Sequence, residues 1–447
     1  MASDNQRGTP VRMRNTLAAV ALITGTVVIA GSAASATTPP TGDTTAATAA
    51  PPPPTTPTTE YAPPTRGGAD LVVWADETRK AVLDPVAAAF ATAEGIKVDV
   101  QFVPFDKIRD NLSKAGPAGE GPDIIVGAHD WLGQLVADGA VEPMELADPA
   151  AFSDVAVKAF TYDGKVYGLP YAIENIALIR NTDLVPEAPK TFEDLAKVAL
   201  QLKADGKVDV PLAIQQGPAD PYHNFPLYTM TGANVFAQNA DGTYDPTKLG
   251  LDTPEALQSA KNFAQWSKDG LINKDVSYDI MIDSFGSGKA PFAITGPWAV
   301  SDGERGFKVK GVKYAVEPIP PLTADGPTPH VFVGVQGFMI SSFSKNKDLA
   351  KSFLMDYVNT KDVQVELFNK GGRPPAMTAA FDAVKADVDV QGFGAAGQAG
   401  QPQPAIPAMG SVWDGWKDAY SQIFTGVDPE QAFKDAATAI RAKIAGS

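Results

Sequence analysis

The 447-residue sequence contains no cysteine, and its positive charge is outweighed by acid. Without cysteine the chain can form no disulfide bond, no thiolate metal site and no cysteine nucleophile, and it offers no cysteine for a lipid anchor. With 37 basic and 52 acidic residues the formal net charge is -15. Because so acidic a surface is repelled by nucleic acids and by anionic membranes, we expect no nucleic-acid partner.

Motifs of common catalytic chemistry are also missing. The sequence contains no glycine-rich phosphate loop and no Gly-x-Ser-x-Gly elbow. Its only histidines, His129, His223 and His330, lack the spacing of a His-Glu-x-x-His zinc site. We therefore expect no catalytic residue, no metal and no cofactor, and we expect each histidine to be structural.

The N-terminal part differs in composition from the rest. Arginines precede an apolar run from Leu17 to Ala30, and an Ala-Ser-Ala motif ends at Ala36. This pattern predicts a secretory signal over residues 1–36, and an uncleaved membrane anchor is the alternative. Residues 37–66 are rich in Thr, Pro and Ala, a composition that cannot bury a core and that predicts a disordered linker. We expect a protein outside the cytoplasm, periplasmic or at the cell surface.

The stretch from Gly119 to Trp131 predicts a buried strand that leads into a loop. Ile124 to Val126 is an unbroken β-branched run, typical of a parallel sheet with helices on both faces. Ligands of such sheets lie outside the carboxyl ends of the strands, so His129, Asp130 and Trp131 are expected to face a ligand. The alternative is that Asp130 caps the helix that follows.

From Asp70 onward the pattern alternates between strands and helices. Leu71 to Trp74 and Ile96 to Val103 predict strands, and the helix between them ends at Gly95. Together with the strand at Ile124 they form β-α-β-α-β, which right-handed crossovers make a parallel sheet. The length of the chain predicts more than one folding unit. Further elements are expected as strands at 171–183, 313–319 and 331–340, and as helices at 191–205, 254–270, 280–286 and 347–358.

Aromatic residues stand at several turns. Trp298 directly follows a Gly-Pro pair, Tyr222 and Phe225 lie in an irregular segment with two prolines, and Trp413 and Trp416 flank Asp-Gly. Such rings suit sugars, because the C–H face of a pyranose stacks on an aromatic ring while its hydroxyls donate to carboxylates. Core packing is the alternative for each ring.

The sequence also offers three candidate carboxylates, which are Asp130, Glu174 and Asp220. They suit the binding of hydroxyl groups. They also include candidates for the acid and base of a glycoside hydrolase, which needs two carboxyl groups at a defined separation. Spacing along the chain does not determine that separation, so both interpretations stay open.

Five motifs follow one another along the chain: Gly121-Pro122-Asp123-Ile124-Ile125 with Ala128-His129-Asp130, Leu169-Pro170-Tyr171-Ala172-Ile173-Glu174, Asn181-Thr182-Asp183-Leu184, Thr295-Gly296-Pro297-Trp298-Ala299 and Val331-Phe332-Val333-Gly334-Val335. With these motifs the chain, from about Leu71 to the C-terminus, resembles the bacterial maltose/maltodextrin-binding proteins, the extracellular solute-binding proteins of carbohydrate ABC importers. This resemblance implies an α/β, two-lobed periplasmic-binding-protein fold of the Venus-flytrap type, with doubly wound sheets joined by hinge crossings.

The resemblance also implies a division of the chain. We expect the first lobe to be built from residues 67–172 and 319–374. We expect the second lobe to be built from residues 173–318 and from the C-terminal helices, 375–447.

Matched position by position, the resemblance implies a set of ligand-binding residues. The carboxylates Asp130, Glu174 and Asp220 match acids that bind glucosyl hydroxyls. The aromatic platform is matched by Tyr222, Phe225, Trp298 and Trp413.

This sequence departs from the family pattern at several of these positions. Phe225 stands where better-known members have Trp. Trp131 replaces a ligand-binding Arg, so that a polar contact becomes a stacking contact. The shorter first loop is expected to supply an acid and a base from Asp76, Glu77 and Arg79. The cations nearby, Lys417 and Arg373, are expected on a solvated face.

The function implied is that of a monomeric receptor that captures an oligosaccharide and hands it to the membrane subunits of an ABC permease. Maltose, maltodextrin, cyclodextrin and trehalose all remain open as ligands. The alternatives are an extracellular glycoside hydrolase and a sugar-sensing surface module.

Overall fold

The computed structural model describes residues 61–217, 219–239 and 243–446. The predicted signal, residues 1–36, and most of the predicted linker, residues 37–66, lie outside these ranges. Within the described ranges, every helix is too short or too polar to span a lipid bilayer.

The first sheet contains the three strands predicted to be parallel. β2, β1 and β3 lie side by side and run parallel, as predicted, and β13 then runs antiparallel to both β3 and β6. The strands of this sheet are β1 (Leu71–Ala75), β2 (Val98–Phe102), β3 (Ile124–Ala128), β6 (Leu169–Glu174), β13 (Phe332–Ile340) and β14 (Gln401–Pro402).

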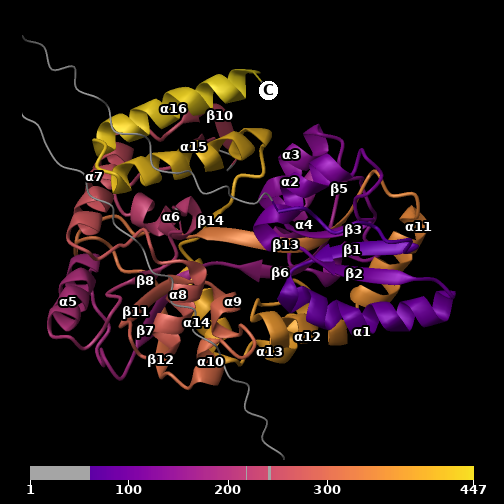
Figure 1. Cartoon of the computed structure of the whole chain (residues 1–447), viewed down its shortest axis with the longest axis horizontal. Coiled ribbons are helices and arrows are strands. Elements are labelled where there is room, and N and C mark those ends of the chain that lie inside the picture. The colour runs from indigo at the N-terminus through magenta and orange to yellow at the C-terminus, as the bar shows by residue number, and fades with distance from the viewer. Residues whose placement is uncertain (1–60, 218, 240–242, 447) are drawn as a thin grey trace, which may run out of the picture. The chain divides into compact units, whose positions relative to one another are not determined.

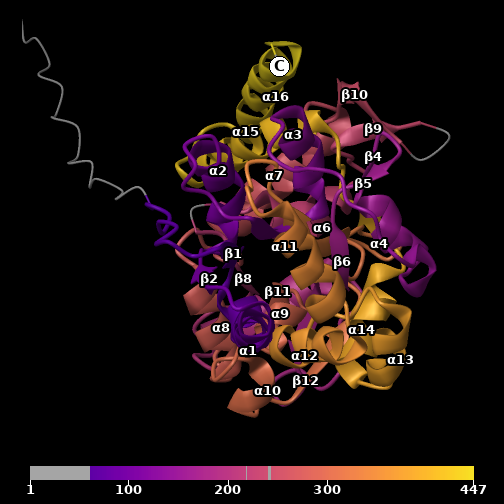
Figure 2. The same cartoon turned by 90° about the vertical axis from the view of Figure 1, so that its right-hand side faces the viewer.

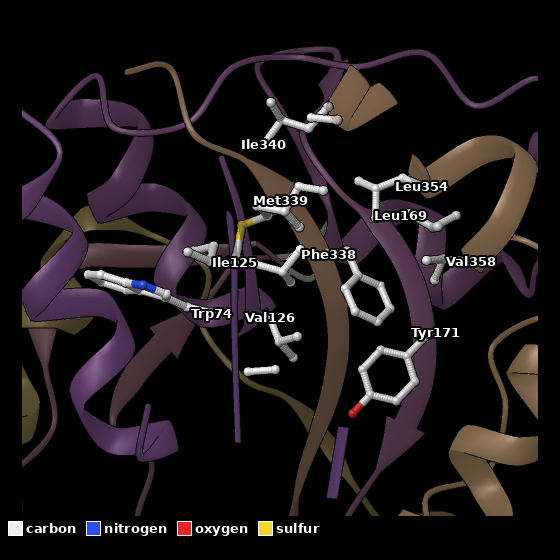
Figure 3. Close-up of a cluster of buried hydrophobic side chains, with 14 of the residues drawn as sticks. Trp74, Ile125, Val126, Leu169, Tyr171, Phe338, Met339, Ile340, Leu354 and Val358 are labelled. Atoms are coloured by element: carbon white, nitrogen blue, oxygen red, sulfur yellow. The ribbon is translucent and has the colours of Figure 1, made fainter. Parts of the chain in front are cut away.

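Helices pack on this sheet around the first hydrophobic core. The β-branched run of β3 is completely buried there, together with Phe338 and Leu354 (Figure 3). Trp74 is also buried, and its indole N–H donates to Gln101 over 2.9 Å, which satisfies the one polar atom of its ring. The elements of this part, which we call the first lobe, also include α1 (Glu77–Glu94), α2 (Phe105–Ala115), α3 (Leu132–Ala137), α4 (Asp154–Ala159), β4 (Thr161–Tyr162), β5 (Lys165–Val166), α11 (Lys347–Ser352), α12 (Lys361–Gly371), α13 (Thr378–Val384) and short turns of helix at His129–Trp131 and Pro149–Ala151.

The helix predicted at 347–358 changes its geometry along its length. It begins as α11 and continues as a π-helix from Phe353 to Val358. Both ends of this wider turn are buried in the first core. The sequence pattern predicts one regular helix here. Packing in the core gives its second half a wider, π-helical geometry instead.

The second sheet is covered on both faces. Its strands alternate, so that Ile176 and Leu178 enter one core whereas Ala177 and Ile179 enter another. α15 and α16 lie side by side in both views (Figures 1 and 2). The elements of this second lobe are β7 (Ala177–Asn181), α5 (Phe192–Ala204), β8 (Ala213–Ile214), α6 (Pro221–Thr229), β9 (Phe236–Gln238), β10 (Tyr244–Leu249), α7 (Pro254–Lys268), α8 (Tyr278–Gly286), β11 (Phe292–Thr295), α9 (Pro297–Val300), α10 (Phe307–Lys310), β12 (Tyr314–Glu317), α14 (Val388–Gly397), α15 (Pro407–Phe424) and α16 (Pro429–Gly446).

Strand segments cross between the lobes, and β6 and β13 lie between the two groups of elements (Figure 1). The stretch predicted as one strand at 171–183 is two strands, β6 in the first sheet and β7 in the second. The break comes at Asn175, whose amide donates to the carbonyls of Ile176 and Phe393. These side-chain bonds lie where pairing in the first sheet ends at Glu174 and pairing in the second begins at Ala177.

The hydrophobic cores show where β13 changes lobe. Phe332 packs in the second lobe and Val335 in the first, whereas Ile319 packs in the second. Ala380 packs in the first lobe. We therefore propose lobe boundaries near 334 and between 380 and 390, in place of those drawn at 319 and 375.

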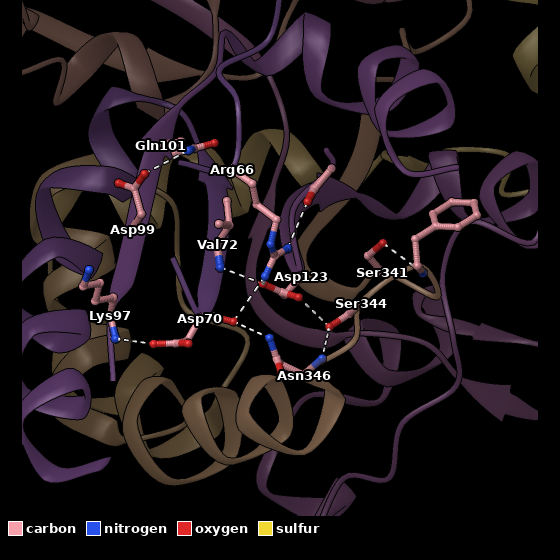
Figure 4. Close-up of polar contacts among 12 residues, drawn as sticks. Arg66, Asp70, Val72, Lys97, Asp99, Gln101, Asp123, Ser341, Ser344 and Asn346 are labelled. Carbon is pink, nitrogen blue, oxygen red and sulfur yellow. Dashed lines mark hydrogen bonds and ion pairs between the residues drawn. The ribbon is translucent and has the colours of Figure 1, made fainter. Parts of the chain in front are cut away.

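The end of the predicted linker contacts the first lobe. The guanidinium group of Arg66 forms an ion pair with the buried carboxylate of Asp123 over 2.6 Å and donates to the Asp70 carbonyl (Figure 4). Asp123 also accepts from the backbone of Val72 and from Ser344. A buried carboxylate needs such partners, and Arg66 supplies its positive charge.

Candidate functional site

A cavity of about 680 Å³ lies between the two lobes. Its first-lobe wall begins where β1, β2 and β3 end, as expected for ligands of parallel strands. The residues that line it are Asp76, Glu77, Thr78, Phe102, Pro104, Phe105, Asp106, Arg109, Ala128, Asp130, Trp131, Glu174, Gln215, Asp220, Tyr222, His223, Tyr278, Trp298, Asp302, Gln336, Arg373, Gln403 and Trp413.

Most of the predicted site residues lie on this wall. The cavity brings together five predicted carboxylates and several predicted rings that are far apart in the sequence. The predicted residues that line it are Asp76, Glu77, Asp130, Trp131, Glu174, Asp220, Tyr222, Trp298 and Trp413.

Asp130 is held at the cavity with unused hydrogen-bonding capacity. Among the described residues its Oδ1 atom has no hydrogen-bond partner. Burial raises its pKa to about 6, against the lowering effects of Arg109 and of a hydrogen bond from Trp413. The capping alternative is not realised, because α3 begins at Leu132 without a side-chain cap from any described residue. Asp130 is thus free to accept a hydroxyl of a ligand.

Glu174 is the centre of a buried polar network. One oxygen accepts from the Gln336 amide over 2.6 Å, and the other pairs with the guanidinium group of Arg373. Arg373 is only 9% exposed and stacks over the Trp298 ring, 5.1 Å from its centroid. Burial alone would lower the pKa of Arg373, but Glu174, Tyr171 and Asp76 raise it above its ordinary value. The expectation of a solvated face was therefore wrong for Arg373, which links the two lobes.

In the first loop, after β1, the acids Asp76 and Glu77 line the cavity, whereas the base Arg79 lies behind them. Asp76 caps α1 by accepting from the backbone of Arg79. Burial alone would raise the pKa of Asp76, but Arg79, Arg373 and hydrogen bonds lower it below its ordinary value. The Arg79 side chain is buried behind the wall, paired with Asp76 and Tyr171 and stacked against Phe105. Arg79 thus positions the carboxylate and does not face the cavity.

The aromatic platform lies at the start of helices in the second lobe. Tyr222 and Trp298 each follow the proline that begins α6 or α9. The Trp298 ring lies over Gly296, where a Cβ atom would come within 2.1 Å of it. Trp413, on α15, stacks on Trp416. Because α6 and α9 begin with proline and Gly296 has no Cβ atom, the rings of Tyr222 and Trp298 have room at the cavity edge.

Phe225 takes a different place from the one predicted. It is 1% exposed and stacks on Phe332, with 3.5 Å between ring centroids. Tyr222 stacks on the same ring from the cavity side. Phe225 therefore supports the platform from the core, through the Phe332 ring on which Tyr222 also stacks.

Two histidines, His129 and His223, have different roles. Burial lowers the pKa of His129 to about 4, so the ring is neutral, accepting from the Val335 backbone and donating to the Gln403 carbonyl. His129 therefore ties β3 to the crossing strand instead of facing a ligand. His223 lines the cavity and bonds to Asp220 over 2.8 Å, which sequence reasoning missed. In the described ranges, no group of three or more acidic, His or Cys side chains is placed to hold a metal ion.

The sequence analysis did not predict one part of the cavity wall, which consists of residues at the end of β2 and at the start of α2. Phe102, Phe105 and Arg109 line the cavity next to Trp131. The Trp131 ring packs on Phe105, with 4.8 Å between centroids, and is largely buried. The rule that ligands lie at the carboxyl ends of parallel strands applied to β2 as well as to β1 and β3 and would have found this part.

The fold and the cavity define a two-lobed binding protein with the periplasmic-binding-protein fold. Residues 86–392 match the family described as bacterial extracellular solute-binding protein, and the chain belongs to this family. The predicted fold and family are thereby confirmed.

Similar proteins have names that refer to oligosaccharides. The maltotriose-binding protein of Pyrococcus abyssi is 30% identical over 75% of this chain and 72% of its own length. The galactooligosaccharide-binding protein of Bacillus subtilis is 28% identical over 84% of this chain and 90% of its own length. The solved Thermus thermophilus maltotriose binding protein, bound with maltotriose, has a TM-score of 0.76 and 31% identity, over 84% of this chain and 100% of that one.

Proposed function

We propose that the chain binds an α-glucan oligosaccharide of the maltose or maltodextrin type between its lobes and delivers it, unaltered, to the membrane subunits of an ABC permease. The observation that carries this proposal is the composition of the cavity, in which strand-end carboxylates face helix-start aromatic rings. Carboxylates accept sugar hydroxyls, and rings stack on the C–H face of the pyranose. Several relatives and a similar solved structure have names that refer to maltose-type sugars.

The mechanism we infer is closure driven by the ligand. Acids of the first lobe and rings of the second bind the same sugar, so the ligand has a higher affinity for the arrangement in which both walls meet. Arg373 supports this, because it contacts Glu174 in one lobe and Trp298 in the other. The secretory signal predicted at 1–36 would take the receptor out of the cytoplasm, and the linker at 37–66 would follow it; an uncleaved signal that serves as a tether is the alternative.

We infer binding without hydrolysis. Glycoside hydrolysis needs an acid and a second carboxylate that acts as base or nucleophile. Asp130 has a raised pKa that would suit an acid, but similar proteins that match most of this chain are named as binding proteins. Incubation with maltopentaose followed by chromatography is expected to return the intact sugar. Shorter products would overturn this part of the proposal.

Calorimetric titration of the purified secreted chain tests the ligand class. We expect maltotriose to bind with a dissociation constant near micromolar, about -8 kcal/mol. A galacto-oligosaccharide of equal length serves as the comparison, because one relative carries that name. Binding of the galacto-oligosaccharide alone would exclude the α-glucan assignment while leaving the receptor role in place.

A further inference from the structure

One part of the cavity wall is left unused by the carboxylates and rings described above. It consists of Phe102, at the end of β2, and of Phe105, Asp106 and Arg109 at the start of α2, and we call it the α2 wall. It belongs to the first lobe, whereas the rings of the platform belong to the second. The cavity thus has aromatic side chains on both sides.

Phe102 is the most informative residue of the α2 wall. Its side chain is 49% exposed although it is one of the large hydrophobic residues. A single exposed apolar side chain is ordinary on a protein surface. Phe102 differs because it lines the ligand cavity, and its backbone carbonyl is held in place by the Tyr61 hydroxyl. An exposed ring at a sugar cavity offers a face on which a pyranose can stack.

The neighbouring ring is fixed from behind. Phe105 packs on Trp131 and lies under the guanidinium group of Arg79, which is 5.1 Å from the ring centroid. Trp131 and Arg79 are both buried. They hold Phe105 at the wall, so that little conformational entropy is lost when a ligand contacts it.

Arg109 adds a hydrogen-bond donor to this wall. Its side chain is a quarter exposed and is paired with Asp110 over 2.9 Å, and its positive charge lowers the pKa of Asp130. Only some of its five N–H groups are used by Asp110, so others remain for hydroxyl groups. Arg109 thus supplies a positive charge to the cavity wall from α2.

We propose that Phe102, Phe105 and Arg109 form an additional glycosyl subsite, which binds the end of an oligosaccharide beyond the units held by the platform. The proposal rests on the proposed function, and it makes the chain selective for longer α-glucans. The cavity volume of about 680 Å³ lies near the middle of the 300 to 1,000 Å³ range typical of ligand pockets, which leaves room for more than one sugar ring. Phe102 ring stacking is then expected to matter only for ligands long enough to reach it.

The test is a calorimetric series of maltose, maltotriose, maltotetraose and maltopentaose on the wild type, Phe102→Ala and Phe102→Tyr. In the wild type, affinity should rise with length until the α2 wall is reached. Phe102→Ala should remove about a three- to tenfold gain at the longer lengths and leave the shortest bound ligand unaffected. Phe102→Tyr keeps the ring and should keep the gain.

Phe381→Ala is the matched control, because Phe381 is 38% exposed on α13 and lies outside the cavity lining. It should leave the whole series unchanged. A loss of equal size at every length, or none at any length, in Phe102→Ala would overturn the subsite while the proposed function stands. A wild type that binds no member of the series would overturn the proposed function itself and the subsite with it.

Discussion

The two walls of the cavity are built by different structural means. In the first lobe the acids stand at strand ends, with Asp76 after β1, Asp130 after β3 and Glu174 at the end of β6. In the second lobe Tyr222 and Trp298 stand in the first turn of helices that begin with proline. The acids depend on hydrogen bonds and ion pairs from neighbours, whereas the rings depend on packing. Polar positions are therefore expected to be sensitive to charge and pH, and ring positions to be sensitive to size.

The largest effect is expected from Arg373→Met, which removes the side chain that joins the walls. Glu174 would be left buried without its ion-pair partner, and breaking such a pair costs about 3 to 5 kcal/mol of unfolding free energy. Urea denaturation of the ligand-free protein measures this cost, and titration with maltotriose should show weakened binding.

Arg180→Met is the control, because Arg180 pairs with Glu317 in the second sheet, away from the cavity lining. It should lower stability and leave maltotriose affinity unchanged. Wild-type stability and wild-type affinity in Arg373→Met would show that the walls do not depend on this bridge.

Trp298→Ala tests the wall that depends on packing. It removes ring stacking, about 0.5 to 1.5 kcal/mol, and the partner of the Arg373 cation–π contact, about 0.5 to 2 kcal/mol. We expect maltotriose affinity to fall about two- to tenfold from the lost stacking, and the ligand-free protein to lose about 0.5 to 2 kcal/mol of unfolding free energy with the cation–π contact. Trp298→Phe should recover part of the loss, and unchanged affinity in Trp298→Ala would refute the platform.

Asp130→Asn tests the wall that depends on charge. The pKa of Asp130 is about 6 in the folded protein and ordinary in the unfolded chain, so between pH 4 and 6 the folded state binds more protons. The ligand-free wild type should therefore lose stability as pH rises through this window. Asp130→Asn should lack this dependence and be more stable by about 2 kcal/mol at pH 7. Its maltotriose affinity should fall, because a neutral amide is a weaker acceptor than a carboxylate.

The charge control is Glu120→Gln, since Glu120 is exposed and outside the cavity lining. Stability curves recorded from pH 4 to 7 distinguish the variants. A wild-type curve that does not fall through this range would contradict the description of Asp130 as a carboxylate destabilised by burial.

The smallest effect on binding is expected at Gly372, where an added Cβ atom would meet the other lobe. Gly372 has φ of +71°, and a Cβ atom there would lie 2.4 Å from the carbonyl oxygen of Pro297 in the other lobe. Gly95 has φ of +68°, and no described atom lies within 4 Å of a Cβ placed there. Each substitution should cost about 1 to 2 kcal/mol in backbone strain, and Gly372→Ala should cost more than Gly95→Ala because its Cβ atom would also displace the Pro297 carbonyl. Only Gly372→Ala should also weaken maltotriose binding, and equal affinities in the two variants would show that this approach is irrelevant to binding.

Much of the fold and part of the site could be predicted because local patterns carry them. The β-branched run of β3, the parallel order of β2, β1 and β3 and the glycine that ends α1 all follow from short-range rules. Asp130 was found because side chains after parallel strands face the ligand edge, whereas Asp76 was found through the resemblance to the maltodextrin-binding proteins. The N-terminal signal and most of the linker stay predictions, since they lie outside the described residues.

The places of the other site residues could not be predicted, because they depend on contacts between segments that are distant in the sequence. Arg79 and Phe225 carry the right chemistry, yet Tyr171 and Phe332 draw them behind the wall. Arg373 looked like a surface cation, but Glu174, 199 residues away, holds it in the cavity.

The sequence by itself determined which residues end strands and begin helices, because backbone preferences and periodicity act over a few positions. Only the tertiary structure decided which of those residues share the cavity. Burial, pairing of charges and ring packing depend on neighbours that the order of residues does not reveal.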